Sequence, residues 1–122
     1  MIEEITEMPV GTVGLRASGT LSKEDYRGVL EPVLNGAAEA GELRLMFVLT
    51  DFHGLEPGAW IEDVKTGLRV WVRDHAAWKR CALVTDVEWV AKAMHMFKWL
   101  TPGEVMIYGL DSLQEAKAWV AA

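Results

Sequence analysis

The sequence predicts an α/β fold: a mixed five-stranded sheet with an antiparallel hairpin at one edge and about four helices. Strand-like and helix-like segments alternate along most of the chain, which is typical of parallel strands joined by right-handed crossovers. Residues 43–50 include an apolar run without polar alternation, as expected for a central strand buried on both faces. With 122 residues, the chain is expected to form one domain, residues 1–122.

The first third of the chain predicts the edge hairpin and the first helix. Strands at 2–7 and 12–18 are separated by a short turn, so they are expected to pair antiparallel. Gly19–Leu21 is expected to leave the sheet. A helix begins after Ser22, a good N-cap, with Asp25 three residues later as a capping-box partner. Pro32 predicts a kink near Glu31, and Gly41 is expected to end the helix.

Three strand–helix units follow. The strand at 43–50 leads through a short loop, Asp51–Gly54, to a helix from about 58 to about 75. A strand at 81–84 leads to a helix at 87–100, with Thr85 or Asp86 as its cap. A last strand at 104–108 precedes a helix that Asp111 and Gln114 are expected to cap.

The helix at 87–100 is apolar on two neighbouring faces. A helix packed on one side of a sheet needs only one such face. The expected buried stripe and the neighbouring apolar face are, respectively, Val87, Val90/Ala91, Met94 and Phe97, and Trp89, Ala93, Met96 and Trp99.

Composition excludes several classes of function. A net charge of −6 argues against nucleic acid as a partner, since phosphate binding needs clustered Lys and Arg. Cys81 is the single cysteine, so no internal disulfide can form, and a reducing, cytoplasmic location is expected. The N-terminus does not read as a signal peptide, and no window predicts a membrane span.

Motifs for common chemistries are missing from the sequence. Neither GxGxxG, GxxxxGK[ST], CxxC nor GxSxG occurs, and no cofactor is expected. The histidines are His53, His75 and His95, too scattered for a metal motif, so no metal is expected either. Asp51 and His53 follow the central strand at an edge where ligands gather in α/β folds. For this pair, acid–base chemistry and a structural role both remain open.

Six tryptophans and six methionines stand out in so short a chain. They are interpreted either as a core dense in aromatics or as an apolar pocket or exposed patch between the helices at 58–75 and 87–100. Lys92 and Lys98 beside the aromatic residues are compatible with contact at a membrane surface.

Several local patterns, in order, resemble the SpoIIAA-like family. They are Gly19-Thr20-Leu21 with Glu24-Asp25-Tyr26, Pro32, Trp60-x-x-Asp63-x-Lys65, His75, Lys79-Arg80-x-Ala82-x-Val84-x-Asp86-x-x-Trp89 and Ala116-x-x-Trp119. The resemblance implies a STAS-like fold related to CRAL-TRIO-like lipid-binding domains, and a cytoplasmic bacterial protein that is often dimeric. Its anti-sigma-antagonist relatives are switched by phosphorylation of a serine before the second helix. Here the corresponding loop, 50–54, contains no serine.

The leading hypothesis is a non-enzymatic module that binds an apolar or amphipathic small molecule or lipid, with peripheral membrane contact. The alternative is a protein-interaction or regulatory module that uses the same aromatic patch, as a homodimer or with another partner. An enzyme that uses Asp51 and His53 is the third hypothesis. The expected ligand-binding residues are His53, Trp60, Asp63, Lys65, Trp71, Trp89, Met96, Phe97 and Trp99.

Overall fold

The computed structural model describes residues 1–56, 65, 77–97 and 103–122. The elements run in the order β1 (Ile2–Ile5), β2 (Val13–Leu21), α1 (Lys23–Asp25), the π-helical turn η1 (Tyr26–Leu30), α2 (Glu31–Glu39), β3 (Leu43–Leu55), β4 (Trp78–Thr85), α4 (Glu88–Phe97), β5 (Glu104–Tyr108), the 3-10 turn η4 (Leu110–Ser112) and α5 (Leu113–Ala121). The helix expected at 58–75 lies outside the described residues, apart from Lys65, which is helical and exposed.

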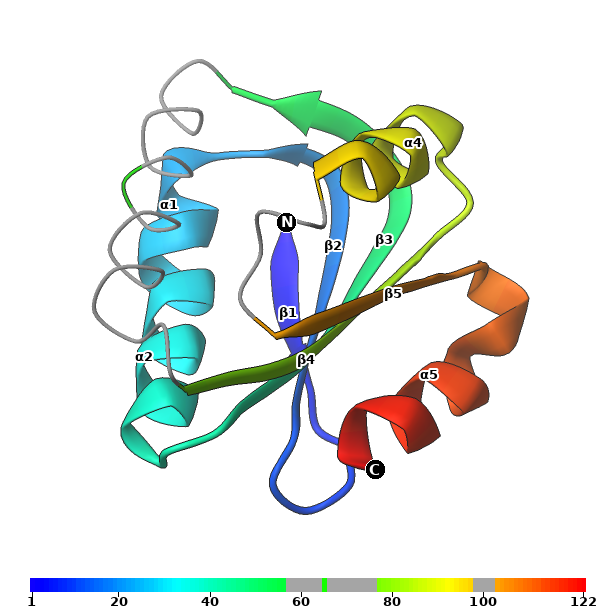
Figure 1. Ribbon diagram of the computed structural model, residues 1–122. Helices are drawn as coiled ribbons and strands as arrows, with labels where there is room; N and C mark the ends of the chain where they lie inside the picture. The colour runs from blue at the N-terminus through cyan, green and yellow to red at the C-terminus, as the bar shows by residue number, and fades with distance from the viewer. Residues whose placement is uncertain (57–64, 66–76, 98–102) are drawn as a thin grey trace.

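The five strands form one sheet in the order β1-β2-β3-β4-β5 (Figure 1). The edge strand β1 is antiparallel to β2, and the remaining neighbours are parallel. This confirms the predicted mixed sheet with its antiparallel edge hairpin.

Helices cover both faces of the sheet, with α1, α2 and α4 on one face and α5 on the other (Figure 1). The central strand β3 contributes side chains to the core on both faces of the sheet, because successive side chains of a strand point to opposite faces. Leu45 and Leu49 belong to the cluster beneath α2 and α4, whereas Met46 and Val48 belong to the cluster beneath α5. The prediction that this strand is buried on both faces is therefore confirmed.

The β2–β3 pairing continues further than expected. Gly19–Leu21 was expected to leave the sheet and Asp51–Gly54 to form a loop, and both expectations are wrong. Gly19 pairs with Phe52 and Leu21 with Leu55, after register shifts that leave Asp51 and His53 without an opposite residue on β2. These are β-bulges, which absorb extra residues in one strand without ending the pairing.

The first helix begins as predicted. Ser22 and Asp25 form a capping box: the Ser22 amide donates to Asp25 Oδ2 at 2.8 Å, and the Asp25 amide donates to Ser22 Oγ at 3.3 Å. Burial alone would raise the pKa of Asp25. Hydrogen bonds from Ser22 and the Met1 ammonium, 3.4 Å from Oδ2, outweigh burial, and the pKa falls below its usual 3.8.

Pro32 disturbs the helix where predicted. A proline lacks the amide hydrogen and its ring crowds the carbonyl four residues earlier, so a regular α-helical register is unfavourable here. The chain takes one π-helical turn, η1, in which the Glu31 amide donates to the Tyr26 carbonyl, and α2 starts at Glu31. At the other end Gly41 adopts φ +100° and its amide donates to Ala38, as expected of a residue that ends a helix.

Of the caps predicted for the later helices, the one at Asp111 is wrong, and Thr85 rather than Asp86 bonds the start of α4. No side-chain hydrogen bond caps α5, because the 3-10 turn η4 precedes it and places Ser112, not Asp111, at the N-cap position. Asp86 accepts a hydrogen bond from the Leu110 amide at 3.1 Å and so caps η4 from the end of β4. Thr85 accepts from the Val87 amide at 3.1 Å just before α4 and donates to the Leu49 carbonyl of β3 at 3.2 Å.

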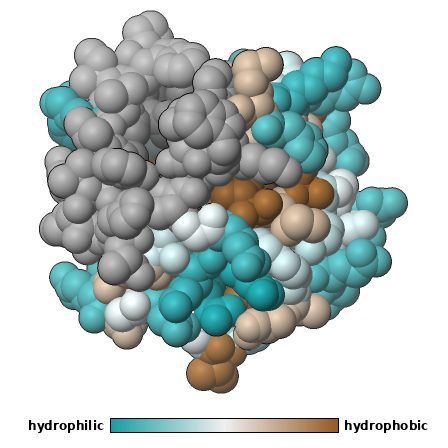
Figure 2. Space-filling view, viewed as in Figure 1, coloured by the Kyte–Doolittle hydropathy of each residue, from teal (hydrophilic) through white to brown (hydrophobic). Residues whose placement is uncertain are grey.

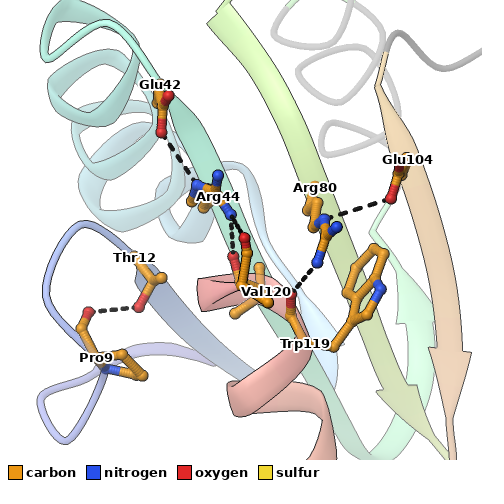
Figure 3. Close-up of polar contacts among 9 residues, drawn as sticks. Pro9, Thr12, Glu42, Arg44, Arg80, Glu104, Trp119 and Val120 are labelled. Atoms are coloured by element: carbon orange, nitrogen blue, oxygen red, sulfur yellow. Dashed lines mark hydrogen bonds and ion pairs between the residues drawn. The ribbon is translucent and has the colours of Figure 1, made fainter.

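Two arginines from neighbouring strands hold the C-terminal end of α5 (Figure 3). Arg44 on β3 donates to the Val120 carbonyl at 2.9 Å, and Arg80 on β4 donates to the Trp119 carbonyl at 2.7 Å. Arg80 also lies over the Trp119 ring, 4.9 Å from its centroid, and pairs with Glu104 at 3.3 Å. The last carbonyls of a helix lack intrahelical donors and carry partial negative charge, so cations here both satisfy and stabilise them.

Replacing Arg80 by alanine is expected to lower the free energy of unfolding by about 1–3 kcal/mol, because a charge-assisted hydrogen bond and a cation–π contact are lost together. Urea denaturation measures the change. The matched control is Arg16→Ala, at an exposed arginine on β2, for which we expect less than about 0.5 kcal/mol. Equal effects of the two substitutions would contradict the role assigned to Arg80.

Candidate functional site

An apolar pocket of about 230 Å³ lies at the carboxyl ends of the parallel strands β2 and β3, beneath α4. This is the edge at which ligands bind in open α/β sheets. Its described lining residues are Leu21, Tyr26, Phe47, Leu49, Phe52, Gly54, Trp89, Val90, Ala93 and Met94.

Three parts of the chain build the walls. Phe47 and Leu49 lie two residues apart on β3 and therefore point to the same face of the sheet. Tyr26 enters from η1 and is only 4% exposed. The α4 wall comes from Val90, Ala93 and Met94, whose spacing of three and four residues puts them on one side of a helix. The pocket thus uses the part of α4 that borders the sheet.

The bulges in β3 bring Phe52 into this wall. Asp51 has no partner on β2, Phe52 pairs with Gly19, and His53 is again skipped. Phe52 consequently lines the pocket, and its ring centroid lies 5.8 Å from that of Trp89, at an interplanar angle of 32°. Trp89 is 57% exposed, so this tilted aromatic pair stands at the mouth of the pocket.

The two bulged residues form a polar pair outside the pocket. His53 Nε2 lies 3.4 Å from Asp51 Oδ1, and their side chains are 62% and 85% exposed. Neither residue lines the pocket. The pair is therefore a solvated contact across the bulge and does not deliver a general base to the apolar site.

Among the described residues, the other reactive or metal-binding side chains do not converge on the pocket. Burial raises the pKa of the Cys81 thiol to about 12, which keeps it protonated at neutral pH and unreactive as a nucleophile. Within the described ranges, no three His, Cys, Asp or Glu side chains are grouped so that they could hold a metal ion. No helix in the part of the chain described here is long and apolar enough to cross a membrane. The arrangement suits the binding of apolar molecules through dispersion and exclusion of water.

The residues predicted for the site fall into three groups. Trp89 lines the pocket, whereas His53 and Met96 do not, and Met96 is 65% exposed on α4. Lys65 is helical and exposed. Phe97 is the last residue of α4, and its side chain lies outside the described part of the structure. The remaining four lie outside the described residues: Trp60, Asp63, Trp71 and Trp99.

Sequence reasoning missed most of the lining. Val90 and Met94 were assigned to the buried stripe of the helix, and Phe52 to a loop. Tyr26 was not among the expected ligand-binding residues. The signal that could have identified the site was the apolar side chain of Phe52 between two polar residues, directly after a buried strand. Because β3 continues past Thr50, this side chain enters the apolar wall.

A larger but more open groove, of about 540 Å³, lies between α2 and the β1–β2 turn. Its walls include the small residues Gly36, Ala37 and Ala40, and Glu4 and Glu42 are among its lining residues. No aromatic side chain lines it in the described part of the chain, so it offers less apolar contact to a ligand than the pocket beneath α4.

The fold and the pocket together define a small α/β domain with an apolar site at the carboxyl ends of its parallel strands. The chain belongs to the SpoIIAA-like family, whose model matches residues 12–121. It is also similar to the crystal structure of an uncharacterized protein of the DUF3478 family with a SpoIIAA-like fold, from Shewanella loihica PV-4. That structure is 26% identical with a TM-score of 0.78, over 98% of this chain and 93% of the other. A comparison with curated proteins finds no match.

These comparisons confirm the family that the order of sequence motifs indicated, and with it the predicted fold class.

The bulge that places Phe52 in the pocket wall also holds Asp51 in a left-handed backbone conformation, with φ +48°. Left-handed backbone is tolerated by aspartate, is unstrained for glycine and is costly for a β-branched residue. We expect Asp51→Gly to change the free energy of unfolding by less than about 0.5 kcal/mol and Asp51→Val to lower it by about 1–3 kcal/mol. Urea denaturation of both variants provides the measurement. If valine were as stable as glycine, the backbone strain inferred at the bulge would be refuted.

Proposed function

We propose that this chain is a non-enzymatic binding module that holds an apolar or amphipathic small molecule in the pocket beneath α4. The observation that carries the proposal is the chemistry of the wall. Every described lining residue is aliphatic, aromatic, methionine or glycine, and the hydroxyl of Tyr26 is the one side-chain oxygen among them. Concave sites with predominantly apolar and aromatic walls are the usual form of small-molecule sites.

The size of the pocket supports a small ligand. An engineered apolar cavity of about 150 Å³ is large enough to bind benzene, and the pocket here measures about 230 Å³. It opens to solvent beside the exposed Trp89. An amphipathic molecule could therefore bury its apolar part and leave its polar part in water. In a membrane-associated role, Trp89 and Met96 would be the apolar side chains of α4 that meet the bilayer surface.

Filling the pocket tests the proposal. Phenylalanine in place of Ala93 is expected to occupy the site and weaken the binding of 1-decanol or 2-naphthol at least tenfold, measured by amide chemical-shift titration. The matched control is Ala118→Phe on the exposed side of α5, which should bind like the wild type. The proposal fails if the wild type binds neither probe, or if both variants bind as it does.

A protein-interaction role is the second candidate, and the exposed face of α4 favours it. Trp89 and Met96 are seven residues apart, on the same side of the helix, and both are exposed apolar side chains. In the view of Figure 2, apolar residues reach the surface in a small area between α4 and β5 and at the β1–β2 turn. Exposed apolar patches are common at interaction surfaces.

Light scattering separates the two candidates. If α4 forms a homodimer interface, the wild type is dimeric and Trp89→Asp is a folded monomer, because burying an unpaired carboxylate in an apolar interface is unfavourable. Asp substitution at the exposed Val10, on the distant β1–β2 turn, is the control. A wild-type monomer, or a Trp89→Asp dimer, contradicts the interface.

A further inference from the structure

We propose that the ligand of the pocket beneath α4 is a neutral molecule with a planar aromatic ring, which binds against Phe52 and Trp89. This inference rests on the proposed function and narrows it to one chemical class. It draws on three observations: the aromatic share of the wall, the geometry of the pair at the mouth and the charge of the surroundings.

Aromatic side chains reach the pocket from three directions. Tyr26 comes from η1, Phe47 and Phe52 from β3, and Trp89 from α4. Met94 adds a thioether, which makes favourable contacts with aromatic rings. Aromatic pairs gain stabilisation beyond that expected from buried area alone. A planar aromatic guest can therefore gain such contacts on several sides, whereas a saturated guest of equal size gains only dispersion and burial.

Phe52 and Trp89 form a direct aromatic contact at the mouth, and the two rings must separate before they can hold a third ring between them as a clamp. Carbon atoms in optimal contact lie about 3.5 Å apart, so a ring held between two parallel rings requires about 7 Å between them. The Phe52 and Trp89 centroids are 5.8 Å apart and their planes are tilted by 32°. A small outward movement of Trp89, whose side chain is more than half exposed, would open this space to one ring.

Charge selects against ionic ligands. No Lys, Arg or His occurs among the described lining residues, and the chain carries a net charge of −6. An anionic head group, such as that of a fatty acid, would thus find no partner in the described wall and would meet an overall repulsive field. An aromatic wall can also attract an organic cation. However, no carboxylate lines the described pocket to offset the cost of burying a cation, so a neutral ring fits better.

The test compares matched probes. Amide chemical-shift titrations use 2-naphthol, its saturated analogue decahydro-2-naphthol, decanoate and choline. We expect 2-naphthol to bind most tightly, about three- to tenfold more tightly than decahydro-2-naphthol, the range that one aromatic contact supports. Shifts should centre on β3 residues near Phe52 and on α4 near Trp89.

Two variants test whether the preference for 2-naphthol over decahydro-2-naphthol comes from the rings of Phe52 and Trp89. Phe52→Leu keeps an apolar side chain but removes the ring, and is expected to reduce the preference for 2-naphthol over decahydro-2-naphthol to below about twofold. Trp89→Leu provides a second variant at an exposed position. Met96→Leu, on the exposed part of α4 outside the pocket, should preserve the wild-type preference.

The outcomes distinguish this inference from the proposed function. Tighter binding of decahydro-2-naphthol or decanoate than of 2-naphthol would overturn the aromatic class and leave an apolar or amphipathic site standing. Tighter binding of choline than of every other probe would indicate a cation site and overturn the neutral class together with the proposed function. An unchanged preference in both Phe52→Leu and Trp89→Leu would overturn the clamp. Absence of binding by all four of these probes and by 1-decanol would refute the proposed function as well.

Discussion

Burial of β3 on both faces is the constraint on which the rest of this structure depends. Leu45 and Leu49 pack under α2 and α4, while Met46 and Val48 pack under α5. Full burial of an aliphatic side chain stabilises the folded state by about 1.5–3 kcal/mol relative to exposure. Exposing either face of β3 to water would therefore be strongly unfavourable. The strand requires a helical layer on each side. The crossover helices α2 and α4 cover one face, and α5, which follows the last strand, covers the other. The pocket forms where one of these layers ends, at the carboxyl edge of the sheet.

The two layers are fixed in different ways. On the face that carries α5, Arg44 and Arg80 hold the last helical carbonyls directly from β3 and β4. On the opposite face, α4 reaches the core through Val90 and the partly buried Met94, and part of its apolar surface lines the pocket. Charge-assisted hydrogen bonds are stronger than neutral ones, so α5 has a polar anchor at its end in addition to its apolar contacts. The described part of α4 that lines the pocket is held against the sheet by apolar packing.

The bulges explain how a structural strand also supplies a binding residue. Two extra residues in β3 are absorbed without loss of pairing, and Asp51 and His53 point to solvent while Phe52 joins the wall. The same local geometry keeps Asp51 and His53 away from the described wall of the pocket. The carboxylate and the imidazole contact each other outside the pocket, so proximity in sequence to the ligand edge does not place them at the ligand.

Features that depend on local periodicity and short-range hydrogen bonding could be predicted from the amino-acid sequence. The buried run of β3, the strand at Glu104–Tyr108, the Ser22–Asp25 capping box and the disturbance at Pro32 all follow from residues within a few positions of one another. Together with the alternation of elements, they sufficed for the fold class and the family.

Tertiary structure alone decided the features that depend on partners distant in the chain. The continued pairing of β3 past Thr50 requires β2 alongside it, and its register shifts cannot be read from either strand alone. Asp86 caps a turn 24 residues away rather than its own helix, and Arg44 contacts a carbonyl 76 residues away. In the same way, Trp89 became a pocket residue while Met96, on the same side of the helix, did not. The helical period gives both the same direction, and only the end of the sheet beneath α4 determines which of them meets an apolar wall.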